Sequence, residues 1–224
     1  MKETSKSVMR CLHDGRFISR YFVGDGIDIG CGSDPISLYS EFFPLMKSLK
    51  PWDLPDGDAQ ILEGVADNSF DFVHSSHCLE HMRNPEEALK NWFRVLKPNG
   101  HLVILVPDED LYEMGVFPST NNTDHKWTFT LWKKNSWCNK SINVMDLVKT
   151  LDETSQVIKL DLLDGQHRYN LPRMDQTLTP VGECAIEIII RKRPETELIQ
   201  KGRMPATGQL TKDGFFALTG IRVA

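Results

Sequence analysis

The sequence lacks a long hydrophobic run and any excess of positive charge. No stretch approaches the ~20 apolar residues that a membrane-spanning helix needs, and the first residues have no apolar core of signal-peptide length. Lys and Arg number 26 against 31 Asp and Glu, which gives a net charge of −5. Because a phosphate backbone is bound mainly by basic side chains, nucleic acid is not an expected partner, and neither is membrane insertion.

Paired cysteines are missing as well. The five cysteines are an odd number and form no CxxC spacing, so the sequence indicates neither a disulfide framework nor a zinc ribbon. Reduced thiols in a cytoplasmic protein are the simplest interpretation. The 224 residues suffice for one sizeable core, and a second full domain is not expected.

Apolar runs suited to buried strands alternate with amphipathic stretches suited to helices, which is typical of a parallel sheet covered on both faces. Residues 27–29, 70–73 and 102–106 are the clearest strands. Between the last two, Asn84 followed by Pro85 predicts a helix start, because Asn caps free amides and Pro tolerates the first turn. Leu89, Trp92, Phe93 and Leu96 are expected to form the apolar face of this helix.

A glycine-rich turn follows the first strand, in the run Asp28-Ile29-Gly30-Cys31-Gly32. Glycines at such a turn let the backbone approach a ligand closely. A dinucleotide fingerprint needs a third glycine three residues after the second, and Pro35 occupies that position. The turn therefore predicts a nucleotide-type cofactor, although it does not match the dinucleotide fingerprint.

The run Gly-Ile-Asp-Ile-Gly-Cys-Gly resembles the first motif of class I S-adenosylmethionine-dependent methyltransferases. Later motifs follow in the order of the small-molecule, type 11-like branch of that family. They are Gly57-Asp58-Ala59, residues 67–73, His77-Cys78-Leu79-Glu80-His81 and residues 94–100. The resemblance is strong over residues 22–107 and extends to Arg193 through a compatible strand pattern.

The resemblance implies an α/β fold of Rossmann-like type: a seven-stranded mixed sheet with helices on both faces and an antiparallel last strand. The methyltransferase domain would span 1–193, with an N-terminal helical cap over 1–24 and a substrate lid or insert over 107–143. Residues 194–224 are predicted to be a polar C-terminal tail. The state of assembly implied is a monomer or homodimer.

The resemblance also implies S-adenosylmethionine as cofactor. Gly30, Cys31 and Gly32 would approach its methionine portion through backbone, and Asp28 would orient the turn or the cofactor amine. Carboxylates suit ribose hydroxyls, since two adjacent donors match two acid oxygens. The predicted cofactor residues are Asp28, Gly30, Cys31, Gly32, Asp53, Asp58, Ala59, Ser76 and His77.

The region after the glycine turn departs from the family pattern. Only about two dozen residues separate Gly32 from Gly57, where the family has room for a full helix. That helix is expected to be short or missing, and Asp53 can instead serve only as a turn acid. A non-catalytic cofactor-binding or partner-binding subunit with a degenerate site is therefore the alternative function.

His77-Cys78-Leu79-Glu80-His81 also satisfies the HxxEH pattern of a zinc protease family. That chemistry needs both histidines on one continuous helix, whereas a strand runs directly into this motif and the next helix begins only at Asn84. We therefore predict no metal. In the methyltransferase interpretation, Glu80 and His81 fasten the loop, and His77 faces the ligand cleft at the carboxyl end of a strand.

Methyl transfer is an in-line displacement, so much of the rate can come from placing the acceptor behind the methyl carbon. A hydroxyl acceptor must also lose a proton. The candidate catalytic residues are His77, His125 and Asp108, the last two lying beyond the strand that ends at Val106. The sequence is similar to methyltransferases encoded among surface-polysaccharide functions, which implies O-methylation of a small molecule or a sugar or polysaccharide precursor.

Overall fold

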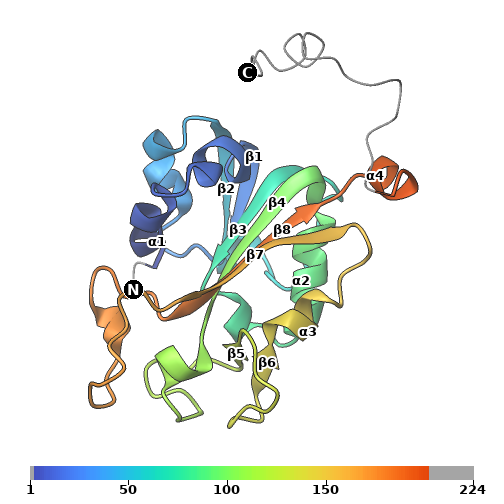
Figure 1. Ribbon diagram of the computed structural model, residues 1–224. Helices are drawn as coiled ribbons and strands as arrows, with labels where there is room; N and C mark the ends of the chain where they lie inside the picture. Colours follow the sequence, from blue (N-terminus) through green and yellow to red (C-terminus); the bar gives the residue numbers. More distant parts are fainter. Residues whose placement is uncertain (1–2, 202–224) are drawn as a thin grey trace, which may run out of the picture. The chain divides into compact units, whose positions relative to one another are not determined.

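The computed structural model describes residues 3–201, so most of the predicted tail (202–224) lies outside the described residues. The chain divides into two units, residues 1–193 and 194–224 (Figure 1). In the second unit, α4 (Glu195–Ile199) is a single short helix. Within the described range, no helix has the length and apolar character that crossing a membrane requires.

The first unit is built on a six-stranded sheet in the order β2-β1-β3-β4-β8-β7. Strands β1 to β4 pair in parallel, and β8 is antiparallel to both neighbours. The Rossmann-like α/β fold and the inserted antiparallel last strand are therefore confirmed. The strands are β1 (Gly24–Ile29), β2 (Met46–Trp52), β3 (Phe70–Ser76), β4 (Leu96–Pro107), β7 (Ser155–Leu163) and β8 (Ala185–Lys192).

The main sheet has one strand fewer than the seven expected, among the residues described. After Trp52 the chain enters a one-turn helix, η3 (Leu54–Asp56), and reaches Asp58 directly. No length remains there for the helix and strand that the family places between these points. β2 is consequently an edge strand.

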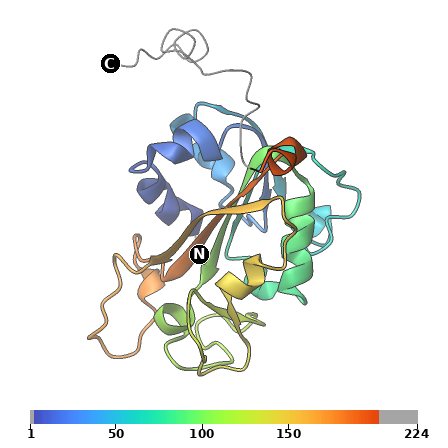
Figure 2. The ribbon, with the colours of Figure 1, turned by 45° about the vertical axis from the view of Figure 1, so that its right-hand side comes forward.

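Helices cover both faces of the sheet, as Figures 1 and 2 show. In β4, Leu102, Ile104 and Val106 join one apolar core, and the alternate residues Val103 and Leu105 join the other. This alternation is that of a strand buried on both sides. One face carries α1 (Glu3–Cys11), η1 (Phe17–Tyr21) and η2 (Ile36–Phe42), and the other carries α2 (Pro85–Arg94) and α3 (Val144–Val148).

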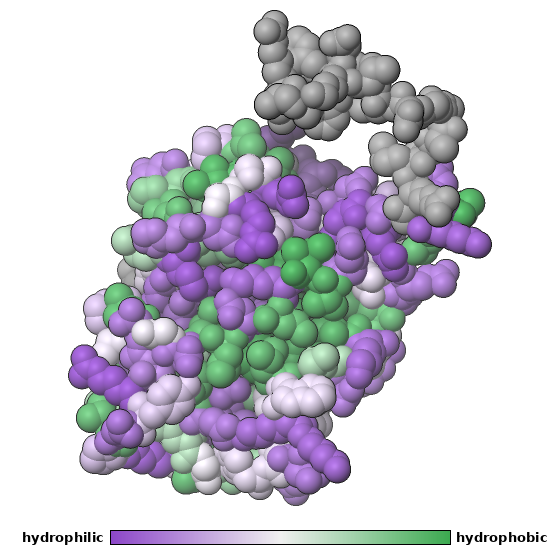
Figure 3. All heavy atoms as spheres, viewed as in Figure 1, coloured by the Kyte–Doolittle hydropathy of each residue, from purple (hydrophilic) through white to green (hydrophobic). Residues whose placement is uncertain are grey.

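The edge strand β7 is less well covered than its neighbour β8. Figure 3 shows apolar side chains gathered in the middle of the face that is turned to the viewer in Figure 1. Val157 of β7 is 43% exposed, whereas Ile188 and Ile190 of the adjacent β8 are buried. The sheet thus becomes more exposed toward this edge.

Helix α2 starts where its sequence predicts. The Asn84 side chain accepts hydrogen bonds from the amides of Glu86 and Glu87, and Pro85 is the first helical residue. The helix ends at Arg94, earlier than its apolar pattern suggests, because Leu96 already pairs with Phe70 in the sheet.

The predicted insert, 107–143, begins with the short helix η5 (Glu109–Glu113). It continues into two short parallel strands, β5 (Thr128–Thr130) and β6 (Ser141–Asn143), which form a second sheet. The insert returns to the main body at the loop after β3, where the amides of Lys126 and Trp127 donate to the Glu80 carbonyl. Elements distant in the sequence therefore meet at the carboxyl ends of β1 and β3.

Candidate functional site

The glycine turn lies directly after β1. Gly30 and Gly32 have φ of +71° and +53°, the left-handed region that favours glycine. A Cβ at Gly30 would lie 2.3 Å from the Cys78 Sγ, so the loop after β3 packs against this glycine. The Gly30 amide donates to the Trp52 carbonyl, 2.8 Å away. The turn is thus held between the ends of two neighbouring strands.

Asp28 lies beneath the turn and is buried. Its Oδ2 accepts from the Ile36 amide at 2.7 Å, and its Oδ1 lies 2.7 Å from the His74 Nδ1. An ionised carboxylate is only an acceptor, so His74 donates to it. Of the two roles expected for Asp28, these contacts correspond to orienting the turn.

Asp53 follows the last residue of β2 and connects that strand to the turn. Its Oδ2 accepts from the Gly32 amide at 2.8 Å, and its Oδ1 accepts from the Leu54 amide at 2.7 Å. Each carboxylate oxygen can accept two hydrogen bonds, so both keep capacity for a ligand. Asp53 is therefore a turn acid and also a wall of the cavity beside it.

That cavity has a volume of about 590 Å³, within the range of small-molecule sites. Asp58 accepts from Arg83 Nη2 at 2.6 Å, a hydrogen bond that lowers the pKa of the Asp58 carboxyl. The Ala59 carbonyl accepts from the Trp92 indole at 2.8 Å. The predicted cofactor residues that line this cavity are Gly30, Asp53, Asp58, Ala59 and His77.

A second cavity of about 340 Å³ shares Gly30, His77 and His81 with the first. It also contains polar groups from α1 and from the insert, among them Thr4 and Asn121. The predicted site residues that line it are Gly30, Cys31, Gly32, Ser76, His77 and His125. The structure therefore gathers eight of the predicted cofactor residues around two adjoining cavities, while Asp28 lies beneath them.

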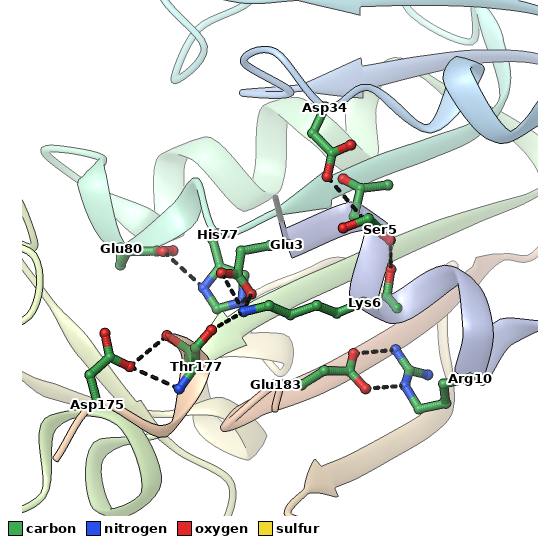
Figure 4. A network of polar contacts seen from close by, with 12 residues as sticks. Glu3, Ser5, Lys6, Arg10, Asp34, His77, Glu80, Asp175, Thr177 and Glu183 are labelled. Atoms are coloured by element: carbon green, nitrogen blue, oxygen red, sulfur yellow. Dashed lines mark hydrogen bonds and ion pairs between the residues drawn. The ribbon is translucent and has the colours of Figure 1, made fainter. Parts of the chain in front are cut away.

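His77 lies where the cavities meet, in a left-handed backbone conformation (φ +53°). Figure 4 shows its ring between Glu80 and Glu3, with Nδ1 3.6 Å from Glu80 Oε1 and Nε2 3.9 Å from Glu3 Oε2. Burial lowers the pKa of this imidazole, but the two carboxylates outweigh burial and raise it. The ring therefore holds a proton more firmly than an ordinary histidine.

His125 comes from the insert and is buried beside Glu80. Its Nδ1 lies 2.8 Å from Glu113 Oε1, and its Nε2 lies 3.8 Å from Glu80 Oε1. His81 faces the same carboxylate, with Nε2 at 3.8 Å. The sequence predicted His125 as a base but did not predict this cluster of Glu80, His81 and His125. The HxxEH motif and Asp124-His125 were its only signals.

Asp108, the third predicted catalytic residue, lines neither cavity. Its Oδ1 caps η5 by accepting from the amides of Asp110 and Leu111, at 2.9 and 3.0 Å. Burial raises the pKa of this carboxyl from 3.8 to about 6, against the effect of these two hydrogen bonds. The structure thus places Asp108 at the root of the insert, where it caps η5.

Asp108→Asn should increase stability near neutral pH. Between pH 4 and 6 the unfolded carboxyl ionises while the folded one keeps its proton, so wild-type stability falls as the pH rises. Asn retains the capping oxygen and does not titrate. Since one pKa unit corresponds to about 1.4 kcal/mol, we expect a gain of roughly 1–3 kcal/mol at pH 7. Urea unfolding should show little gain at pH 4; an equal gain at both values would contradict the assignment.

Part of the chain is similar to known proteins. Residues 36–104, which include Asp53, Asp58 and His77, match the family model described as a methyltransferase domain. Over 72 residues the chain is 39% identical to the ubiquinone/menaquinone biosynthesis C-methyltransferase UbiE of Roseobacter denitrificans. That match covers 28% of each chain, so this chain spans little more than a quarter of the relative's length.

Solved structures share the fold at low identity. A chain from the complex of the Haloferax volcanii Trm112 methyltransferase activator with a protein described as a methyltransferase aligns at TM-score 0.55 and 12% identity, covering 86% of this chain and 91% of that chain. An S-adenosylmethionine-dependent methyltransferase from Archaeoglobus fulgidus aligns at TM-score 0.52 and 14% identity, covering 86% and 95%. With the sheet order, these likenesses show that the chain has the fold of the S-adenosylmethionine-dependent methyltransferases, and residues 36–104 match a methyltransferase domain.

Proposed function

We propose that this chain transfers the methyl group of S-adenosylmethionine to a hydroxyl oxygen of a small molecule or of a sugar or polysaccharide precursor. The observation that carries the proposal is the pair of cavities that meet at Gly30, His77 and His81. One has the carboxylates suited to a nucleoside, and the other is lined largely by polar side chains. Cofactor and acceptor can thus lie side by side.

The larger cavity is the proposed cofactor site. Asp53 would accept from the ribose hydroxyls, and Asp58 and Ala59 would border the adenine. The methionine portion, when bound, supplies the electrophilic methyl group near Gly30 and Gly32. A Cβ at Gly32 would come no closer than 3.9 Å to Asp53 Oδ2, so space beside this backbone is open to a ligand.

The smaller cavity is the proposed acceptor site. Ser76 lines it, and within residues 3–201 its Oγ is buried without a hydrogen-bond partner. Such a group is costly unless a ligand or water pairs with it. Thr4, Asn121 and Asn122 add further donors and acceptors. This lining favours a hydroxylated acceptor over an apolar ring.

His77 is the proposed proton acceptor, because it lines both cavities. In the transfer, the acceptor O–H bond breaks and its proton moves to the imidazole. The bound cofactor would supply the methyl group to that oxygen and keep the electron pair of the S–C bond on sulfur, leaving as a neutral thioether. Glu80 and Glu3 would stabilise the resulting imidazolium. His125 is held within the insert by Glu113, and Asp108 caps η5.

The experiment is calorimetric titration of S-adenosylmethionine and of its demethylated product, followed by transfer of a labelled methyl group to sugars and to an apolar phenol. We expect micromolar cofactor binding and label in the hydroxylated acceptors. Cofactor binding with no transfer to any acceptor would support the non-catalytic subunit instead. No cofactor binding by the wild-type protein would refute the proposal.

A further inference from the structure

The Glu80 carboxylate has an unusual environment. The residue is completely buried, and within residues 3–201 neither carboxylate oxygen has a hydrogen-bond partner. An ionised carboxylate in such a place is costly unless it is paired or binds a metal. Its neighbours are imidazole nitrogens of His77, His81 and His125, at 3.6, 3.8 and 3.8 Å from Oε1. These separations exceed the ~2.7–3.2 Å of a hydrogen bond.

The second nitrogen of His125 determines which atom faces Glu80. Its Nδ1 lies 2.8 Å from Glu113 Oε1, and both residues are buried. A carboxylate only accepts hydrogen bonds, so Nδ1 carries the proton of this contact. In the neutral ring, Nε2 then presents a lone pair toward Glu80.

His81 repeats this arrangement from the other side. Its Nδ1 lies 3.0 Å from Asp124 Oδ2 and 3.2 Å from the Asp124 carbonyl, so Nε2 again presents a lone pair toward Glu80. A histidine whose other nitrogen donates to a carboxylate or carbonyl is the usual arrangement of a metal ligand. The rings of His81 and His125 are 5.0 Å apart between centroids. Two lone pairs and a carboxylate oxygen therefore converge, each within 4.8 Å of the others.

We propose that Glu80, His81 and His125 bind a divalent transition-metal ion, with zinc the best match. Two imidazoles and one carboxylate suit zinc, whereas magnesium and calcium prefer oxygen ligands. With bonds of about 2.0–2.2 Å, tetrahedral ligands lie roughly 3.4 Å apart. The two separations of 3.8 Å between Glu80 Oε1 and the histidine Nε2 atoms need only a small contraction, and the three ligand atoms all lie within 4.8 Å of one another.

A cluster in which the histidines carry protons on Nε2, with no metal, fits the observed distances less well. If His81 and His125 carried protons on Nε2, each could donate to Glu80 by closing to hydrogen-bond distance, and Glu80 would not be without partners. Three carboxylates, Glu80, Glu113 and Asp124, also surround these two rings. A divalent cation offsets that charge. The sequence-based prediction of no metal excluded a zinc site formed by His77 and His81 on one helix. The site proposed here uses His125 of the insert in place of His77.

The site would have a role in catalysis. All three ligands line the smaller cavity, and three protein ligands leave a tetrahedral ion one open position. The chemistry that the ion supplies there is binding of the acceptor hydroxyl and lowering of its pKa. This role rests on the proposed function, whereas binding of the metal does not.

Zinc titration of chelator-treated full-length protein tests the site, with cobalt absorption as a second reading. We expect one ion per chain. Glu80→Gln, which has nearly the same shape, and His81→Ala, whose side chain is only 23% exposed, should each lower affinity at least tenfold. Asp124→Asn, which removes only the carboxylate beside His81, should lower it roughly tenfold. His13→Ala, an exposed histidine outside the cluster, is the matched control.

Absence of saturable binding at one ion per chain would overturn the proposal. Equal zinc affinity of wild type, Glu80→Gln and His81→Ala, with folding verified by circular dichroism, would also overturn it. The cluster would then only hold the insert in place. Calorimetric titration of the cofactor into the zinc-free protein distinguishes this outcome from failure of the proposed function. If the metal proposal is wrong, the measured cofactor affinity still stands. If the methyltransferase proposal is wrong, the measured zinc stoichiometry still stands.

Discussion

Asp53→Ala is expected to weaken S-adenosylmethionine binding by about 10- to 100-fold. The variant would lose the carboxylate proposed to accept from the ribose, and hydrogen bonds to charged groups contribute about 1.5–3 kcal/mol. It would also lose the bond that holds Gly32, so the turn is less organised before the cofactor arrives. Calorimetric titration of the cofactor measures the effect.

Two variants separate these contributions. Asp67→Asn removes an exposed acid that pairs with Arg94 outside both cavities, and it should bind cofactor like wild type. Asp53→Asn keeps one acceptor oxygen and should fall between wild type and Asp53→Ala. If Asp53→Ala bound cofactor with unchanged affinity, Asp53 would be only the turn acid that its local hydrogen bonds describe.

Gly30→Ala should destabilise the fold by about 2–4 kcal/mol. The new Cβ would meet Cys78 Sγ at 2.3 Å, and overpacking of this kind costs about 1–3 kcal/mol. The left-handed backbone adds roughly 1 kcal/mol for a residue with a side chain. Urea unfolding, analysed at constant slope, measures the sum.

Gly32→Ala is the matched control for Gly30→Ala. Its backbone is also left-handed, but its Cβ would have no heavy atom closer than 3.9 Å, so only the backbone cost of about 1 kcal/mol remains. Adding Cys78→Gly to Gly30→Ala should recover the overpacking part. Similar losses for the two alanine variants would mean that Cys78 does not pack on the turn as described.

Local sequence signals predicted the fold well where the structure they specify depends only on neighbouring residues. Asn84 and Pro85 predict the start of α2 without any contribution from distant residues, and the helix begins at Pro85 in the structure. The strand count was different. The short spacing between Gly32 and Gly57 signalled a lost helix, but it did not show that the strand expected after that helix is absent as well. The sheet accordingly has six strands within the described residues.

Site residues divide in the same manner. Gly30 sits in a motif whose spacing fixes its place at the end of a parallel strand, whereas the shortened region after Gly32 left Asp53 open between a ribose ligand and a turn acid. Asp108 also follows a strand, yet its oxygen caps η5 because unsatisfied amides lie within three residues of it. The cluster around Glu80 was missed because it depends on how the insert folds back, and no periodicity encodes that contact.

The shortened connection after β2 has an effect on the cofactor cavity. Residues 57–60 rest on α2, where Trp92 donates to the Ala59 carbonyl and Gln60 contacts Glu87, Asn84 and Asn91. Because residues 57–60 form no strand, this wall of the cavity depends on α2 for its rigidity. Loosening of α2 would therefore reach the cavity directly, and a ligand bound against the wall would in turn protect the amides of α2 from hydrogen exchange.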